Sequence, residues 1–156
     1  MRHAFFYDTW AFAALANRRD PAHDVAAELD RELERQAYVA VTSDYILDEA
    51  LTLLSVSAGA KAALGFLHGF LARVEAGDIQ LLQVTPGRRD RALRLFRRIA
   101  PAERRLSFTD ATSFSLMHEL SIQDAFTADR HFHRAGGGVR PLVELKSGRF
   151  DIIDIA

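Results

Sequence analysis

The chain contains no cysteine among its 156 residues. Disulfide bonds, thiolate metal sites and cysteine nucleophiles are therefore excluded. It also lacks any uncharged run of 18 residues, so the sequence predicts no transmembrane helix. Near the N-terminus, Asp8 interrupts the apolar stretch too early for the core of a signal peptide. We therefore expect a cytoplasmic protein with no membrane partner.

The chain also has no large excess of positive or negative residues. The chain carries 20 basic and 21 acidic residues, which gives a net charge of −1. This balance argues against a protein that coats nucleic acid through an overall positive potential. Any contact with nucleic acid must then be local. The one basic stretch, residues 88–105, holds eight arginines against two acids, Asp90 and Glu103.

The alternation of short apolar runs with amphipathic segments predicts the fold class. Nearly half of the residues are hydrophobic, 49%, as in an ordinary globular domain. We expect one domain over residues 1–145 and a C-terminal tail, residues 146–156. Strands are predicted at residues 3–7, 38–41, 79–84, 125–128 and 139–142. Helices are predicted at residues 10–17, 21–36, 44–57, 59–76, 86–100 and 110–120.

Strands that alternate with helices indicate a three-layer α/β/α sandwich on a mainly parallel sheet. Several capping signals support the helix starts. Asp20 and Pro21 are expected to begin the second helix, Thr42 and Ser43 the third, and Ser107 the last. Functional sites in such folds lie beyond the carboxyl ends of the strands.

Three carboxylates lie at element boundaries where both a structural and a functional role are open. Asp8 and Asp129 each follow a predicted strand, which places them at the functional edge of the sheet. Asp8 also suits the N-cap of the next helix, and Asp129 suits a turn or a surface ion pair. Asp110 fits a capping box with Ser107, yet its helix face is the one that should point inward.

Glu49 is a carboxylate in an apolar setting. On a helical wheel of residues 44–56 it falls between Leu53 and Val56, so we expect it to emerge from a stripe that faces the sheet. A buried carboxylate needs a positive partner. An arginine or lysine would meet that need, and a metal-centred cluster is the interpretation we favour. The polar residues gather on the opposite side of the wheel: Asp44, Asp48, Thr52 and Ser55.

Taken as a set, the four carboxylates predict a metal site. Carboxylates that converge in a water-accessible cleft repel one another, and a hard divalent cation such as Mg²⁺ relieves that repulsion. One or two such ions can activate water and stabilise the charge that develops during attack on a phosphodiester. The sequence therefore predicts a metal-dependent nuclease.

Four segments of the chain resemble the PIN-domain family, and in particular the VapC-like ribonuclease toxins of toxin–antitoxin pairs. These segments are FFYDTWAF, TSDYILDEALTLL, LSFTDATSFSLMHEL and DAFTADRHFHRAG. The resemblance implies that Asp8, Glu49, Asp110 and Asp129 bind Mg²⁺ or Mn²⁺ and drive RNA cleavage, with Asp8 and Asp110 as the most direct ligands.

The same resemblance implies further properties. The hydroxyls of Thr9 and Thr109, each beside one of the aspartates, orient water or a carboxylate, although both are equally ordinary as helix-cap residues. An RNA substrate, a homodimer and a small inhibitory antitoxin are also implied. The tail KSGRFDIIDIA extends past the expected final strand, and its apolar residues suggest an edge strand or packing on a second subunit.

The helix at residues 86–100 is the predicted RNA contact. Arg91, Arg94 and Arg98 gather on one side, where they suit phosphate binding as well as a plain solvated face. A zinc site at His131 and His133 is disfavoured, because a spacing of two residues splays the rings apart on a helix.

Rival functions fit less well. A haloacid-dehalogenase-type phosphatase needs a second aspartate at position 10, which is Trp10, and a Rossmann domain needs a glycine-rich first turn. Two rivals stay open: a structure-specific DNA nuclease with the same acids, and a catalytically silent PIN-like module that binds RNA or protein.

Overall fold

The computed structural model describes residues 3–153. Its five-stranded sheet has the order β3-β2-β1-β4-β5, and every neighbouring pair of strands is parallel. The strands of this sheet are β1 (Ala4–Tyr7), β2 (Val39–Ser43), β3 (Ile79–Leu82), β4 (Asp124–Phe126) and β5 (Arg140–Pro141). The predicted α/β/α architecture is confirmed, and the last strand is shorter than residues 139–142.

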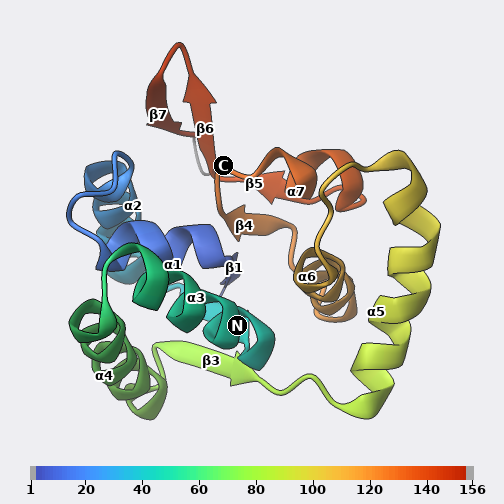
Figure 1. Cartoon of the computed structure of the whole chain (residues 1–156), viewed down its shortest axis with the longest axis horizontal. Helices are drawn as coiled ribbons and strands as arrows, with labels where there is room; N and C mark the ends of the chain where they lie inside the picture. The colour runs from blue at the N-terminus through green and yellow to red at the C-terminus, as the bar shows by residue number, and fades with distance from the viewer. Residues whose placement is uncertain (1–2, 154–156) are drawn as a thin grey trace.

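Two groups of helices flank this sheet (Figure 1). One group packs around α1 and α3, and the other is an α5–α6 hairpin with the short α7 beside it. The first group comprises α1 (Thr9–Ala16), α2 (His23–Arg35), α3 (Asp44–Ser57) and α4 (Ala60–Ala76). The second comprises α5 (Pro86–Ile99), the 3₁₀ turn η1 (Ala100–Ala102), α6 (Phe108–Glu119) and α7 (Arg130–Ala135). No helix within residues 3–153 combines the length and apolarity needed to cross a membrane.

The start of α2 differs from the sequence prediction. The helix begins at His23, and the carboxylate of Asp20 accepts a hydrogen bond from the backbone N–H of Ala22 at 2.8 Å. Asp20 and Pro21 therefore form a separate turn before the helix, which is the other common use of this residue pair. Of the two proposed caps of α3, Ser43 accepts from the N–H of Ile46, whereas Thr42 donates to the carbonyl of Tyr7.

The sheet is buried on both faces by large apolar side chains. Phe6, Phe114, Phe126 and Phe132 are fully buried, and the rings of Phe114 and Phe132 meet edge to face at 4.9 Å between centroids. This contact fixes α7 against α6. A polar contact joins the sheet to the helices on the other side: the hydroxyl of Tyr7 in β1 donates to Asp30 of α2 at 2.7 Å.

The C-terminal tail forms a hairpin of its own. Strands β6 (Val143–Lys146) and β7 (Arg149–Ile152) pair antiparallel and form a second, two-stranded sheet. Positive φ angles at Ser147 and Gly148 suit the tight turn between them. The tail is thus not an edge strand of the main sheet. The predicted boundary at residues 145/146 falls inside β6, and Ile155 lies outside the described residues.

The hairpin packs on its own domain. Phe150 contacts Trp10 of α1 at 5.6 Å between ring centroids, and Val143 and Leu142 at its base are buried. The division into a nuclease domain and a separate tail stays a prediction.

Replacing Gly136 by alanine should destabilise the fold. A Cβ at this position would collide with the carbonyl oxygen of Phe132 and lie 2.7 Å from the Cβ of Val139. Such overpacking typically costs about 1–3 kcal/mol. The matched control is Gly87→Ala on α5, where nothing lies within 4 Å of the added Cβ. Chemical denaturation should show a clear loss for Gly136→Ala and little change for Gly87→Ala; equal stabilities would contradict the packing at Gly136.

Candidate active site

Asp8 lies at the carboxyl end of β1, beside the end of β4. Its side chain is only 5% exposed and forms no capping hydrogen bond with α1, so the N-cap role is wrong for the side chain. Instead, the Thr127 hydroxyl donates to Asp8 Oδ2 at 2.8 Å. The pairing of Tyr7 with Phe126 in the parallel register brings these two residues together.

Asp110 fulfils its capping role and still faces the site. Its Oδ2 accepts from the backbone N–H of Ser107 at 3.1 Å, while the Ser107 hydroxyl accepts from the N–H of Asp110 at 2.9 Å. This reciprocal capping box fixes the carboxylate at the start of α6. The carboxylate keeps a second oxygen that the capping box does not occupy.

Asp129 caps α7 and is held from two directions. Its backbone N–H donates to the Thr127 hydroxyl at 3.0 Å. Its Oδ1 accepts from the backbone N–H of His131 at 2.9 Å and lies 3.0 Å from the ring Nδ1 of the same residue. Thr127 therefore contacts both Asp8 and Asp129 through one hydroxyl group.

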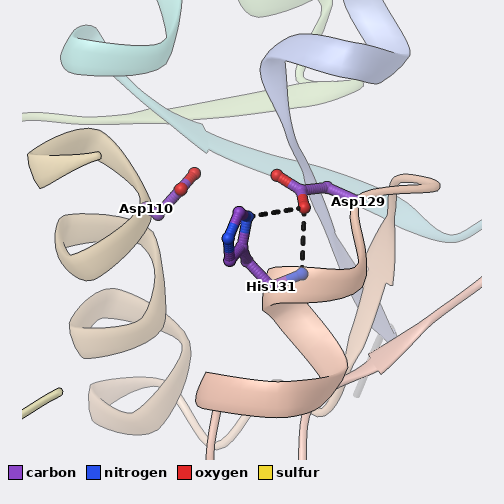
Figure 2. A group of neighbouring side chains, drawn as sticks. All are labelled: Asp110, Asp129 and His131. Carbon is purple, nitrogen blue, oxygen red and sulfur yellow. Dashed lines mark hydrogen bonds and ion pairs between the residues drawn. The ribbon is translucent and has the colours of Figure 1, made fainter. Parts of the chain in front are cut away.

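Asp110, Asp129 and His131 form a compact group. One ligand atom from each lies within 4.8 Å of those of the other two, and their side chains converge between α6 and α7 (Figure 2). The other ring nitrogen of His131, Nε2, lies 2.8 Å from the carbonyl oxygen of Arg104. Because both ring nitrogens face oxygen acceptors, the imidazolium form donates to both.

The electrostatics of the site follow from burial and from like charges. Burial, with the charges of Asp110 and Asp129, raises the pKa of Asp8 to about 7, against the opposing hydrogen bond from Thr127. Burial and Asp129 also raise the pKa of Asp110. Burial lowers the pKa of His131, but the Arg104 carbonyl and the two aspartates outweigh it and raise the pKa overall.

These residues fit a divalent cation. Asp8, Asp110 and Asp129 lie at one edge of the sheet, where the charges of Asp110 and Asp129 raise the pKa of Asp8. Asp110 and Asp129 each have a second oxygen beyond the bonds described above. Oxygen donors and uncompensated negative charge are what Mg²⁺ and Mn²⁺ require. When it is protonated, His131 places a positive charge beside Asp110 and Asp129.

The surroundings of Glu49 differ from the sequence prediction. Leu53 and Val56, expected to face the sheet, are 43% and 84% exposed, whereas the buried residues of α3 are Ile46, Ala50 and Leu54. Glu49 is therefore at the flank of the helix and half-buried. It forms no ion pair with a described arginine or lysine, and its role as a metal ligand stays a prediction.

Among the described residues, neither hydroxyl of the two predicted auxiliary threonines donates to an aspartate. Thr9 is 6% exposed, and its buried hydroxyl has no partner among them. Thr109 is half-buried at the start of α6. Their roles stay predictions.

The arginines of α5 divide into two sets. Arg88 and Arg91 both pair with Glu119 of α6 at 2.9 Å. Arg94 and Arg98 are exposed and form no ion pair within residues 3–153. Arg91, Arg94 and Arg98 line a groove of about 610 Å³ between α5 and α6. The predicted RNA contact of these arginines stays a prediction.

Thr127 and the ring of His131 are the site residues to which sequence reasoning gives no role. A signal for Thr127 existed: it stands two residues before Asp129, so both project to the same side of an extended segment. His131 stands two residues after Asp129, the spacing at which an aspartate carboxylate accepts the backbone N–H. The contact of its ring with Arg104 depends on tertiary structure and has no local signal.

Fold and site together define a class: an α/β protein whose acidic cluster, at the carboxyl edge of a parallel sheet, is suited to a divalent cation. The family model described as the PIN domain matches residues 5–138. The chain belongs to the PIN-domain family.

Similar proteins refine this assignment. The 23S rRNA-specific endonuclease VapC20 of Mycobacterium tuberculosis, from strains CDC 1551 and H37Rv, is 34% identical over 131 residues, which is 84% of this chain and 93% of the relative. The crystal structure of VapC20, described as a sarcin-ricin loop cleaving toxin, matches with a TM-score of 0.70 and 32% identity. That match covers 88% of this chain and 99% of the relative.

Asp8→Asn should stabilise the metal-free protein at high pH. The pKa of Asp8 is about 7 in the folded state and 3.8 ordinarily, so between these values the unfolded chain is ionised and the folded chain is protonated. The free energy of unfolding then falls by up to about 1.4 kcal/mol per pH unit, and the loss is complete above pH 7. Asparagine does not titrate, and it can still accept from Thr127.

Thermal unfolding in EDTA checks this expectation. At pH 8 the Tm of Asp8→Asn should exceed that of the wild type by several degrees, and near pH 4 the two should agree. Added Mg²⁺ should raise the Tm of the wild type more than that of the variant. Asp90→Asn, on the exposed surface of α5, is the control and should follow the wild type. A variant that is less stable than the wild type at pH 8 in EDTA would contradict the electrostatic account.

Proposed function

We propose that this protein is a Mg²⁺-dependent endoribonuclease, the toxin of a toxin–antitoxin pair. The observation that carries the proposal is the group of buried carboxylates at the edge of the sheet, in which like charges and burial raise the pKa of Asp8 and Asp110. Asp8, Asp110 and Asp129, with Glu49 at the flank, are the proposed ligands of Mg²⁺ or Mn²⁺.

The residues of the chain position these ligands before any ion binds. Thr127 fixes Asp8, the capping box fixes Asp110, and the turn to His131 fixes Asp129. A bound divalent cation supplies charge neutralisation and polarisation of the phosphodiester. Preorganised ligands lose little entropy on binding, which favours both affinity and catalysis.

The names of the relatives suggest the substrate. VapC20 is named a 23S rRNA-specific endonuclease and a sarcin-ricin loop cleaving toxin. We propose an RNA of this kind as the substrate here, a small antitoxin as the inhibitory partner, and a homodimer as the assembly.

Asp8→Asn and Asp110→Asn should each abolish metal-dependent cleavage. Each substitution removes a negatively charged proposed metal ligand, and we expect the cleavage rate to fall at least about a hundredfold. Mutation of residues that only support a metal ligand already lowers activity by about 10–100-fold. The assay is cleavage of a labelled sarcin–ricin stem–loop RNA with Mg²⁺, Mn²⁺ or EDTA. Asp90→Asn is the matched control and should retain full activity.

The outcomes separate the rival functions. Cleavage that survives both substitutions or EDTA would overturn the mechanism. Faster cleavage of the DNA version of the same stem–loop would favour the DNA nuclease. Binding of RNA without cleavage under every metal condition would favour the silent binding module.

Arg94→Glu and Arg98→Glu should weaken RNA binding and reduce its salt dependence. Each exposed arginine that contacts a phosphate contributes about 0.7 to the slope of log affinity against log salt for a single strand. The measurement is RNA binding in EDTA over a range of salt concentrations. Arg31→Glu, on the exposed face of α2, makes the same change in net charge. A slope equal to that of the control would remove the α5–α6 groove from the RNA-binding surface.

A further inference from the structure

A pocket lies beside the segment that carries Asp129. It lies between α7, β5 and the β6–β7 hairpin and has a volume of about 490 Å³, within the range of about 300–1,000 Å³ usual for ligand pockets. Its walls include Ala128, Arg130, His133 and Arg134 on one side and Val143 and Leu145 on the other.

The pocket and the site share a short segment of backbone. Ala128 and Arg130, which line the pocket, are the two chain neighbours of Asp129. The backbone N–H of Val143 donates to the carbonyl of Thr127 at 3.1 Å, and the Thr127 hydroxyl donates to Asp8. The pocket and the candidate active site are therefore linked through the backbone of residues 127–130.

The lining combines an apolar wall with positive charge. Pro141, Val143, Leu145 and Ile153 form the apolar part. Arg130 is exposed and has no ion pair with any residue in the range 3–153.

The remaining charges of the lining are mostly compensated. Arg134 pairs with Glu103 at 3.4 Å, and Arg140 pairs with Asp124 at 2.7 Å. Glu144 also lines the pocket and offers a carboxylate acceptor. Arg130 is thus the cation that is most available to a ligand.

We propose that this pocket receives one unstacked nucleotide of the RNA substrate, adjacent to the cleaved phosphodiester. The inference rests on the proposed ribonuclease function. A nucleobase offers a flat apolar face to Leu145 and polar edges to Glu144, while its phosphate suits Arg130. Sequence-specific recognition of RNA relies on such splayed bases in loops.

One wall of the pocket lies outside the segment that matches the PIN-domain family model. The PIN-domain match ends at residue 138, whereas the hairpin wall begins at Val143. The catalytic residues come from the matched segment, and one wall of the pocket comes from outside it.

The test pairs a change in the protein with a change in the RNA. Leu145→Gln keeps the size of the side chain but makes the wall polar, and Leu145 is 45% exposed, so folding should be unaffected. Leu64→Gln, at a 65% exposed position on α4, is the matched control. The probes are a sarcin–ricin stem–loop RNA and copies in which one nucleotide flanking the cleaved bond is abasic.

We expect Leu145→Gln to raise KM about tenfold, as for the loss of one good base contact. One abasic copy should raise KM of the wild type similarly, and the two changes together should cause no further loss. Arg130→Gln should also raise KM. Equal KM values for Leu145→Gln and Leu64→Gln, or fully additive effects at every flanking position, would overturn the proposal.

Failure of the two proposals can be told apart. Efficient metal-dependent cleavage with unchanged KM in the pocket variants would overturn this inference alone. If the wild type binds RNA without cutting it, the Kd values of the wild type and Leu145→Gln for the intact and abasic RNAs are measured in EDTA. Non-additive effects of the protein and RNA changes on Kd would then support the pocket although the enzyme proposal fails. Absence of binding to every RNA probe would overturn both.

Discussion

The parallel pairing of β1 with β4 is the constraint on which the candidate site depends. This pairing sets Tyr7 against Phe126 and thereby places Asp8 beside Thr127. The Thr127 hydroxyl donates to the Asp8 carboxylate and accepts from the backbone of Asp129. One hydroxyl group thus sets the positions of two acids. A slip of one residue in this register would turn Thr127 to the other face of the sheet and separate them.

The same arrangement holds like charges together, which costs stability in the absence of a cation. The fold offsets part of this cost with local hydrogen bonds: Thr127 for Asp8, Ser107 for Asp110 and His131 for Asp129. The capping box serves two purposes, because the hydrogen bonds that begin α6 also orient the Asp110 carboxylate. Functional sites commonly contain such destabilising interactions between like charges, while the rest of the fold supplies the stability.

Sequence patterns predicted the fold well because most elements bury one clear face. Strand ends also placed Asp8 and Asp129 correctly at the carboxyl edge of the sheet. The wheel of α3 failed because it equates apolar with inward, whereas Leu53 and Val56 are exposed and Ile46, Ala50 and Leu54 are buried. The hairpin had a signal in Ser147 and Gly148, a turn pair between two alternating segments. The contact of His131 with Arg104 joins residues 27 positions apart and has no such signal.

The short helix α7 links the candidate active site to the neighbouring pocket. A helix of six residues has little stability of its own, so its position depends on its anchors. These are Asp129 at its start, the buried ring of Phe132, and the carbonyl of Gly136, which accepts from His118 at 2.6 Å. His131 projects from this helix toward the carboxylates, whereas Arg130, His133 and Arg134 line the pocket. Because α7 carries His131 and the pocket-lining residues, and Asp129 caps its start, a displacement of α7 moves Asp129 and the pocket wall together. Under the proposed function, substrate choice and catalytic geometry are therefore coupled through the backbone of residues 127–136.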